Sequence, residues 1–234
     1  MNLLESMCES WVNNPLVEII KLTRNMGKTK ETKAIKQCGI FEIDKLSSNF
    51  NNLIIELDKR TNNLVIEETK RAYQEKLANT DPLTGAYNRR YLNEFSTDYL
   101  KIVKREKNDF SLLVVDLDDF KRINDTYGHE GGDEVLIEFV KISRDTIREN
   151  DFIVRFGGDE FIILLPNTTM NNAKILANKI INNINEHNMR SKINFSISIG
   201  IAGYEANDLN IDDIILRADN SLYEAKKAGK NRAI

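Results

Sequence analysis

The stretch Arg155-Phe156-Gly157-Gly158-Asp159-Glu160-Phe161 lies between two apolar runs, residues 152–156 and 161–165. Such runs joined by adjacent glycines predict a β-hairpin with a tight turn, because glycine accepts positive φ and lets a ligand approach the bare backbone. Two acidic residues follow the turn directly. An isolated Gly-Gly-Asp-Glu is more often an ordinary solvated turn, so the surrounding sequence decides what this one does.

A second acidic cluster, residues 116–119, closes the apolar run 112–115. Alternation along a strand puts Asp116 and Asp118 on one face, with the carbonyl of Leu117 between them as a further oxygen ligand. Mg²⁺ prefers oxygen ligands and usually binds through one or two carboxylates, together with water and substrate phosphates. Asp116 and an acid from the hairpin therefore predict a site for nucleotidyl transfer, in which two ions assist displacement at phosphorus.

Polar side chains near this cluster suit a nucleotide. Lys121 can pair with phosphate, and Asn124 with Asp133 can read a guanine edge. Taken singly, Asn124 and Asp133 are better explained as caps or turn formers, and His129 as a loop histidine. Further positive charge, which also suits the end of a helix dipole, comes from Lys226, Lys227 and Lys230. Spacing alone leaves both interpretations open.

Length and composition narrow the class of protein. The chain has 234 residues, a formal net charge of -3, and two cysteines, Cys8 and Cys38, without metal-ligand spacing. These values predict one large domain or two small ones, no disulfide framework, and no global field for a nucleic acid partner. The apolar runs are shorter than the roughly 18 residues that span a bilayer, and no signal peptide is apparent. We therefore expect a cytoplasmic protein without membrane contact within this chain.

The residues before about position 80 differ from those after it. From Pro15 to residue 79 apolar residues follow helical spacing. Afterwards helical stretches alternate with four short apolar runs, which predicts an α/β or α+β domain; the runs are residues 110–117, 152–156, 160–165 and 195–202. An a/d seam of the later helix comprises Ile43, Leu46, Phe50, Leu53, Leu57 and Leu64. Two short heptad helices bury such seams by pairing with a second copy of the chain, or by packing on their own C-terminal domain.

The predicted order is an N-terminal segment 1–14, a helical dimerisation and signalling module 15–66, a helical linker 67–79 and a catalytic domain 80–234. The module, with Asn14-Pro15-Leu16, Gly27 and Glu42-Ile43-Asp44, resembles a HAMP module. HAMP modules form parallel four-helix bundles in homodimers and usually follow a membrane receptor. This resemblance implies a homodimer and allows a membrane sensor upstream.

From Asp81 to Ile234 the chain resembles the GGDEF family of diguanylate cyclases. Five ordered segments carry the resemblance: residues 81–90 (Asp-Pro-Leu-Thr-Gly-Ala-Tyr-Asn-Arg-Arg), 116–133, 157–161, 198–200 and 218–231. The family implies a central, mostly antiparallel sheet flanked by helices, similar to the polymerase palm and the nucleotidyl cyclases. It also implies condensation of two GTP into cyclic di-GMP, with release of two pyrophosphates, at a homodimer interface.

The family's functional positions transfer residue by residue. The resemblance implies two Mg²⁺ ions per half-site, with Mn²⁺ as an alternative, held by Asp116, the Leu117 carbonyl, Asp159 and Glu160. Asp159 also matches the acceptor of the 3′-hydroxyl proton, and Asp159 and Glu160 form the catalytic pair. The GTP-binding positions are Lys121, Asn124, His129, Asp133, Gly157, Gly158, Lys226 and Lys230. Lys230 replaces an Arg of many relatives, which removes bidentate phosphate contact, and Asp133 favours two guanines.

Arg148 and Asp151 match the RxxD inhibitory site of the family, at the expected offset before the hairpin. This match implies feedback by cyclic di-GMP, and the alternative is a surface ion pair. A different function is a catalytically silent module that binds GTP or cyclic di-GMP and signals to a partner. A coiled-coil adaptor would leave both acidic clusters unexplained.

Overall fold

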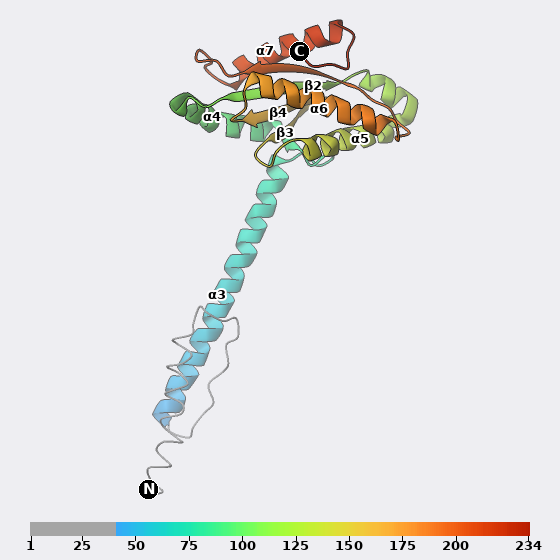
Figure 1. Ribbon diagram of the computed structural model, residues 1–234. Helices are drawn as coiled ribbons and strands as arrows, with labels where there is room; N and C mark the ends of the chain where they lie inside the picture. Colours follow the sequence, from blue (N-terminus) through green and yellow to red (C-terminus); the bar gives the residue numbers. More distant parts are fainter. Residues whose placement is uncertain (1–40) are drawn as a thin grey trace, which may run out of the picture. The chain divides into compact units, whose positions relative to one another are not determined.

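The computed structural model describes residues 41–234, and the first described element is the 39-residue helix α3 (Phe41–Asn79) (Figure 1). It includes the predicted linker 67–79 as continuous helix. Seam residues Leu46, Leu53 and Leu64 are 48%, 49% and 60% exposed. The predicted helix after Pro15 lies outside the described residues. The chain divides into two compact units between Tyr73 and Gln74.

The second unit contains a five-stranded sheet with the order β1-β3-β4-β2-β5. Its strands are β1 (Tyr87–Asn88), β2 (Phe110–Leu117), β3 (Phe152–Gly157), β4 (Glu160–Pro166) and β5 (Ile197–Gly203). β1 pairs with β3 in parallel, and the other pairings among these five strands are antiparallel. The predicted mostly antiparallel sheet is therefore confirmed, and the four apolar runs lie in β2, β3, β4 and β5, except that residues 195 and 196 precede β5.

Four helices cover the two faces of this sheet (Figure 1). They are α4 (Arg89–Glu106), α5 (Phe120–Thr146), α6 (Met170–Asn188) and α7 (Ile211–Lys227). All eight residues of β2 are buried. Leu113 and Val115 belong to the cluster with α5 and α6, whereas Leu112 and Val114 belong to the cluster with α4 and α7. Alternation along β2 thus assigns one helix pair to each face.

Helix α7 lies unusually close to β5. A Cβ atom added to Gly200 would lie 1.9 Å from the carbonyl oxygen of Ala218 and 2.4 Å from the backbone nitrogen of Leu222. Both obstacles are backbone atoms, so a larger residue at position 200 would require the helix to move. Gly200 therefore sets the height of α7 above the sheet.

The segment after α7 returns to the sheet and runs along β5. Ile199 N donates to Arg232 O (2.9 Å), Ile201 N donates to Ile234 O (2.8 Å), and Ile234 N donates to Ile199 O (3.0 Å). Residues 232–234 thus cover the outer edge of β5. Within residues 41–234, no helix is long and apolar enough to cross a membrane.

Candidate active site

The acidic residues of the two predicted clusters meet where β2 and β4 pair. The antiparallel register sets Asp116 opposite Glu160, and Leu117 N donates to the carbonyl oxygen of Asp159 over 3.3 Å. Gly157 pairs with Glu160, so Gly158 and Asp159 form the turn of the β3–β4 hairpin. The register therefore brings Asp116 of β2 close to Glu160 of β4, and the adjoining turn adds the carboxylate of Asp159.

The carboxylate of Asp116 is the buried member of this group, with 9% of the residue exposed. Burial raises its pKa, and the negative charges of Asp159 and Glu160 add to that rise. Lys226 on α7 opposes it, because its Nζ lies 2.8 Å from Asp116 Oδ1. A cation beside Asp116 would stabilise its ionised carboxylate against both burial and the repulsion by Asp159 and Glu160.

The donor set fits Mg²⁺. Within the described residues, no group of three or more Asp, Glu, His or Cys side chains is placed so that it could hold a metal ion by itself. Mg²⁺ does not require one, because it usually takes one or two carboxylates and completes its shell with water and phosphate oxygens. Asp116, Asp159 and the Leu117 carbonyl supply hard oxygen ligands of that kind.

The backbone conformation of the hairpin glycines differs from the prediction. Neither Gly157 nor Gly158 has positive φ, so the expected conformational reason for them is wrong. A Cβ atom on Gly158 would meet nothing within 4 Å, whereas one on Gly157 would lie 3.3 Å from Glu160 Oε2. Gly158 thus leaves open space beside the acids, which agrees with the second expected reason, room for a ligand.

The predicted guanine-binding residues lie on α5, which changes direction at Gly128 (φ 76°, ψ 175°). A Cβ atom on Gly132 would lie 1.9 Å from Asn124 Oδ1, so Asn124 packs directly against that glycine. Asp133, next to Gly132, is exposed, as is His129. Asn124 and Asp133 are inside helical turns, so their interpretation as caps or turn formers is wrong, whereas His129 directly follows the break at Gly128.

The predicted phosphate-binding lysines are placed as follows. Lys121 is exposed in the first turn of α5, and Lys226 lies in the last turn of α7 and contacts Asp116. Lys230, after α7, has its Nζ 2.6 Å from Asp119 Oδ1. The pairing with Asp119 raises the pKa of Lys230. Two of the three ammonium groups thus lie beside the acidic end of β2.

Sequence reasoning missed the role of Arg155. Its Nη1 lies 3.1 and 3.2 Å from the two carboxylate oxygens of Asp81, and its Nε and Nη2 donate to the Gly158 carbonyl at 3.0 and 2.8 Å. Burial alone would raise the pKa of Asp81, but hydrogen bonds from Thr84 and Arg155 outweigh it and lower that pKa. Arg155 therefore ties the hairpin turn to the start of the domain. Both partners stood inside recognisable motifs, but no local pattern pairs them.

The predicted inhibitory residues lie between α5 and β3. Arg148 is exposed, and its backbone N–H donates to Asp151 Oδ2 over 2.9 Å. Burial raises the pKa of Asp151, against the opposing effects of that hydrogen bond and the Arg148 charge. The contact uses the backbone of Arg148, so its guanidinium group is not needed to close this turn.

Comparison with known sequences gives one family. The family described as "Diguanylate cyclase, GGDEF domain" matches residues 78–232. The chain is 38% identical over 164 residues to diguanylate cyclase DgcM of Escherichia coli, covering 68% of this chain and 39% of that protein. It is 35% identical to response regulator PleD of Caulobacter vibrioides over 163 residues, 68% of this chain and 36% of that protein. The chain thus spans about two fifths of the length of these curated relatives.

Comparison with solved structures agrees. The crystal structure of the coiled coil and GGDEF domain of DgcB from Caulobacter crescentus, in complex with c-di-GMP, is similar with a TM-score of 0.66. The sequences are 25% identical, and the match covers 77% of this chain and 97% of the other.

Proposed function

The chain belongs to the GGDEF family of diguanylate cyclases, and from this membership we propose that it condenses two GTP molecules into cyclic di-GMP with release of two pyrophosphates. The observation that carries the proposal is the meeting of Asp116, Asp159 and Glu160 at the paired ends of β2 and β4. Three carboxylates beside a lysine suit a reaction whose substrates bring phosphates and cations.

The residues of this chain divide the binding of GTP between them. Asn124 and Asp133 read the guanine edge, the amide and the carboxylate facing its hydrogen-bonding groups. Gly132 makes room for Asn124 in that arrangement. Lys226 and Lys230 neutralise phosphate charge, and both stand beside carboxylates at the end of β2. Lys121 and His129 add substrate contacts.

Asp116, Asp159 and the Leu117 carbonyl would hold Mg²⁺, two ions per half-site, with Glu160 as a further acid. When bound, the ions would activate the attacking 3′-oxygen and stabilise the negative charge of the departing pyrophosphate. Asp159 accepts the proton of the 3′-hydroxyl. Gly158, whose Cα faces open space, lets the nucleotide approach the backbone of the turn.

Catalysis requires two copies of the chain. Each protomer holds one GTP, and the 3′-oxygen of one nucleotide attacks the α-phosphorus of the other in line, so two half-sites must face each other. The seam of α3 supports pairing, because Leu46, Leu53 and Leu64 are about half exposed or more in a single chain. The DgcB structure contains a coiled coil together with its GGDEF domain, which supports the same role for α3. A change in helix packing would then control the approach of the half-sites.

Product feedback through Arg148 and Asp151 completes the proposal. The exposed Arg148 guanidinium offers bidentate hydrogen bonds to a guanine edge or a phosphate. We expect Arg148→Ala to retain synthesis and to lose inhibition by added cyclic di-GMP. Unchanged inhibition of this variant would remove the feedback part of the proposal while leaving the reaction intact.

The test of the reaction is product analysis by liquid chromatography and mass spectrometry after incubation with GTP and Mg²⁺. We expect cyclic di-GMP from the parent chain, none from Asp159→Ala, and parental amounts from Asp98→Ala. Asp98 is a matched control because its side chain is 83% exposed on α4, outside the acidic group. Chelation of the metal should stop synthesis and added Mg²⁺ should restore it.

Protein concentration separates the two functions considered for this chain. Product that forms only as dimers accumulate supports the enzyme. Binding of GTP without product, at concentrations where the chain is dimeric, would instead show a catalytically silent binding module.

A further inference from the structure

The carboxylate of Asp118 is buried, yet the reaction proposed above gives it no role. Only 5% of this residue is exposed. Its Oδ1 accepts from Ser198 Oγ (2.7 Å), and its Oδ2 accepts from Ser196 Oγ (2.7 Å) and from the backbone N–H of Asn231 (3.1 Å). One carboxylate thus joins the end of β2 to the start of β5 and to the segment after α7.

The segment after α7 has a backbone that needs such support. Gly229, Lys230 and Asn231 all have positive φ, at 112°, 61° and 48°. Residues with a side chain rarely adopt this left-handed region, and here two do so in succession. The hydrogen bond from Asn231 N to Asp118 falls within this turn, and the adjacent Asp119 holds the Lys230 ammonium group at 2.6 Å.

In the sequence, Asp118 also lies next to the residues expected to hold metal. It follows Leu117 directly, and its own backbone N–H donates to Ser196 O over 2.9 Å. These bonds fix the position of the chain that carries the Leu117 carbonyl and, one residue earlier, the carboxylate of Asp116. The side chain of Asp118 therefore links the residues expected to hold metal to those expected to hold phosphate.

We propose that Asp118 is a positioning residue for the reaction, fixing the turn that carries Lys230 against the end of β2 that carries Asp116 and Leu117. The proposal rests on the proposed function, since it assigns Asp118 to the alignment of metal and phosphate sites. Asp118 itself touches neither substrate nor metal in this scheme. Its removal should weaken nucleotide binding through displaced partners.

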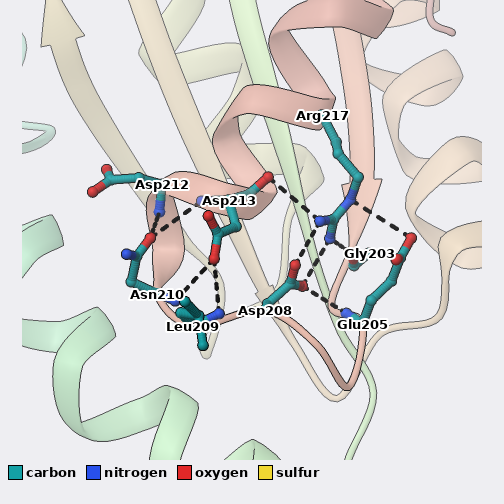
Figure 2. A network of polar contacts seen from close by, with 8 residues as sticks. All are labelled: Gly203, Glu205, Asp208, Leu209, Asn210, Asp212, Asp213 and Arg217. Carbon is teal, nitrogen blue, oxygen red and sulfur yellow. Dashed lines mark hydrogen bonds and ion pairs between the residues drawn. The ribbon is translucent and has the colours of Figure 1, made fainter.

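A matched control exists at the opposite end of the sheet. Asp208 is also buried (8% exposed) and accepts three hydrogen bonds, as Figure 2 shows: from Arg217 Nη1 (2.5 Å), from Arg217 Nη2 (2.8 Å) and from the backbone N–H of Glu205 (2.7 Å). Arg217 further donates to Gly203 O. Gly203 pairs with Ser111, at the other end of β2 from Asp116. Asp208 is thus an equally hydrogen-bonded carboxylate that holds a loop away from the acids.

The experiment compares Asp118→Asn with Asp208→Asn in the full chain. Amide hydrogen exchange monitored by mass spectrometry reports on residues 229–234 and 205–213. Calorimetry measures binding of a non-hydrolysable GTP analogue with Mg²⁺, and steady-state assays give KM and kcat. For Asp118→Asn we expect faster exchange at 229–234 and binding weaker by about 10- to 100-fold, as for other residues that orient metal ligands. For Asp208→Asn we expect faster exchange at 205–213 only, with binding and KM unchanged.

Two results with Asp118→Asn would overturn the proposal. One is exchange at 229–234 that does not change in Asp118→Asn; the other is faster exchange with parental binding of the analogue, which would make Asp118 purely structural. If Asp118→Asn does not fold, Ser196→Ala removes a single donor and should weaken binding in the same direction, by a few-fold, and parental binding of this variant would also refute the proposal.

The outcomes for the reaction and for Asp118 are distinguishable. A parent chain that binds the analogue but makes no cyclic di-GMP contradicts the proposed function, while the binding comparison still decides the role of Asp118. A parent chain that binds no nucleotide contradicts both.

Discussion

The bond between Arg155 and Asp81 predicts a measurable coupling energy. The Arg155 guanidinium contacts both Asp81 carboxylate oxygens and the Gly158 carbonyl, and the two side chains are only 18% and 17% exposed. Hydrogen bonds to charged groups contribute about 1.5–3 kcal/mol, and removal of one partner of a buried pair costs more, since the other is left uncompensated. We expect Arg155→Ala to lower the free energy of unfolding by about 3 kcal/mol. For a chain of this size that loss corresponds to a Tm lower by about 6–12 °C.

A double-mutant cycle isolates the pair from the other bonds of each residue. Urea unfolding, followed by circular dichroism, would compare the parent chain with Arg155→Ala, Asp81→Ala and the double variant. The coupling should be about 1.5–3 kcal/mol. Asp81→Ala alone also removes two hydrogen bonds from Thr84, which is why the single losses cannot be read directly.

The pair Arg60 and Glu56 provides a matched control. Its atoms lie 2.6 Å apart, but the side chains are 73% and 58% exposed on α3, so its coupling should stay below about 1 kcal/mol. An Arg155–Asp81 coupling as small as that of this surface pair would refute the conclusion that Arg155 ties the hairpin to the start of the domain.

Three further predictions follow from the packing and the charges. Gly132→Ala should raise KM for GTP by roughly tenfold in steady-state assays, because the new Cβ would displace the Asn124 amide, while unfolding changes by less than about 1 kcal/mol. Gly200→Ala should destabilise the chain by about 3 kcal/mol or more in urea unfolding, because the new Cβ meets backbone of α7; parental stability would contradict this close contact. Arg217 and the Glu205 N–H outweigh burial and hold the pKa of Asp208 below its ordinary value of 3.8, so the unfolded chain takes up this proton first as pH falls. Its contribution to stability should be present above about pH 4 and be lost as the pH falls through the lower folded pKa; unfolding measured against pH should show a smaller acid loss for Asp208→Asn.

The sequence was sufficient to predict four of the five strands, but not β1 or the exact start of β5. Apolar runs identified β2, β3, β4 and β5 because buried strands concentrate Ile, Val, Leu and Phe. The two-residue strand β1 has no such run, and it exists because Tyr87 and Asn88 pair with Val154 and Arg155 far along the chain. β5 begins at Ile197, two residues after the predicted start, because Ser196 uses its polar atoms to hold Asp118.

The same limit applies to the site. Residue types and spacing predicted which carboxylates meet, since strand ends and a hairpin turn are local features. The partners of Arg155 and Asp118 are 74 to 113 residues away, and no periodicity reports such distances. The glycine turn was assigned correctly although its φ angles were not, because a short connection between apolar strands already implies a hairpin.

The residues that run along β5 after α7 bear on how the protein should be handled. An uncovered strand edge offers a row of free backbone donors and acceptors, on which a second molecule can add its own strand and start aggregation. Residues 232–234 occupy that row through three backbone hydrogen bonds. A version cut before Arg232 would expose the edge and should lose solubility before it loses its fold, so deletions meant to trim the protein belong elsewhere.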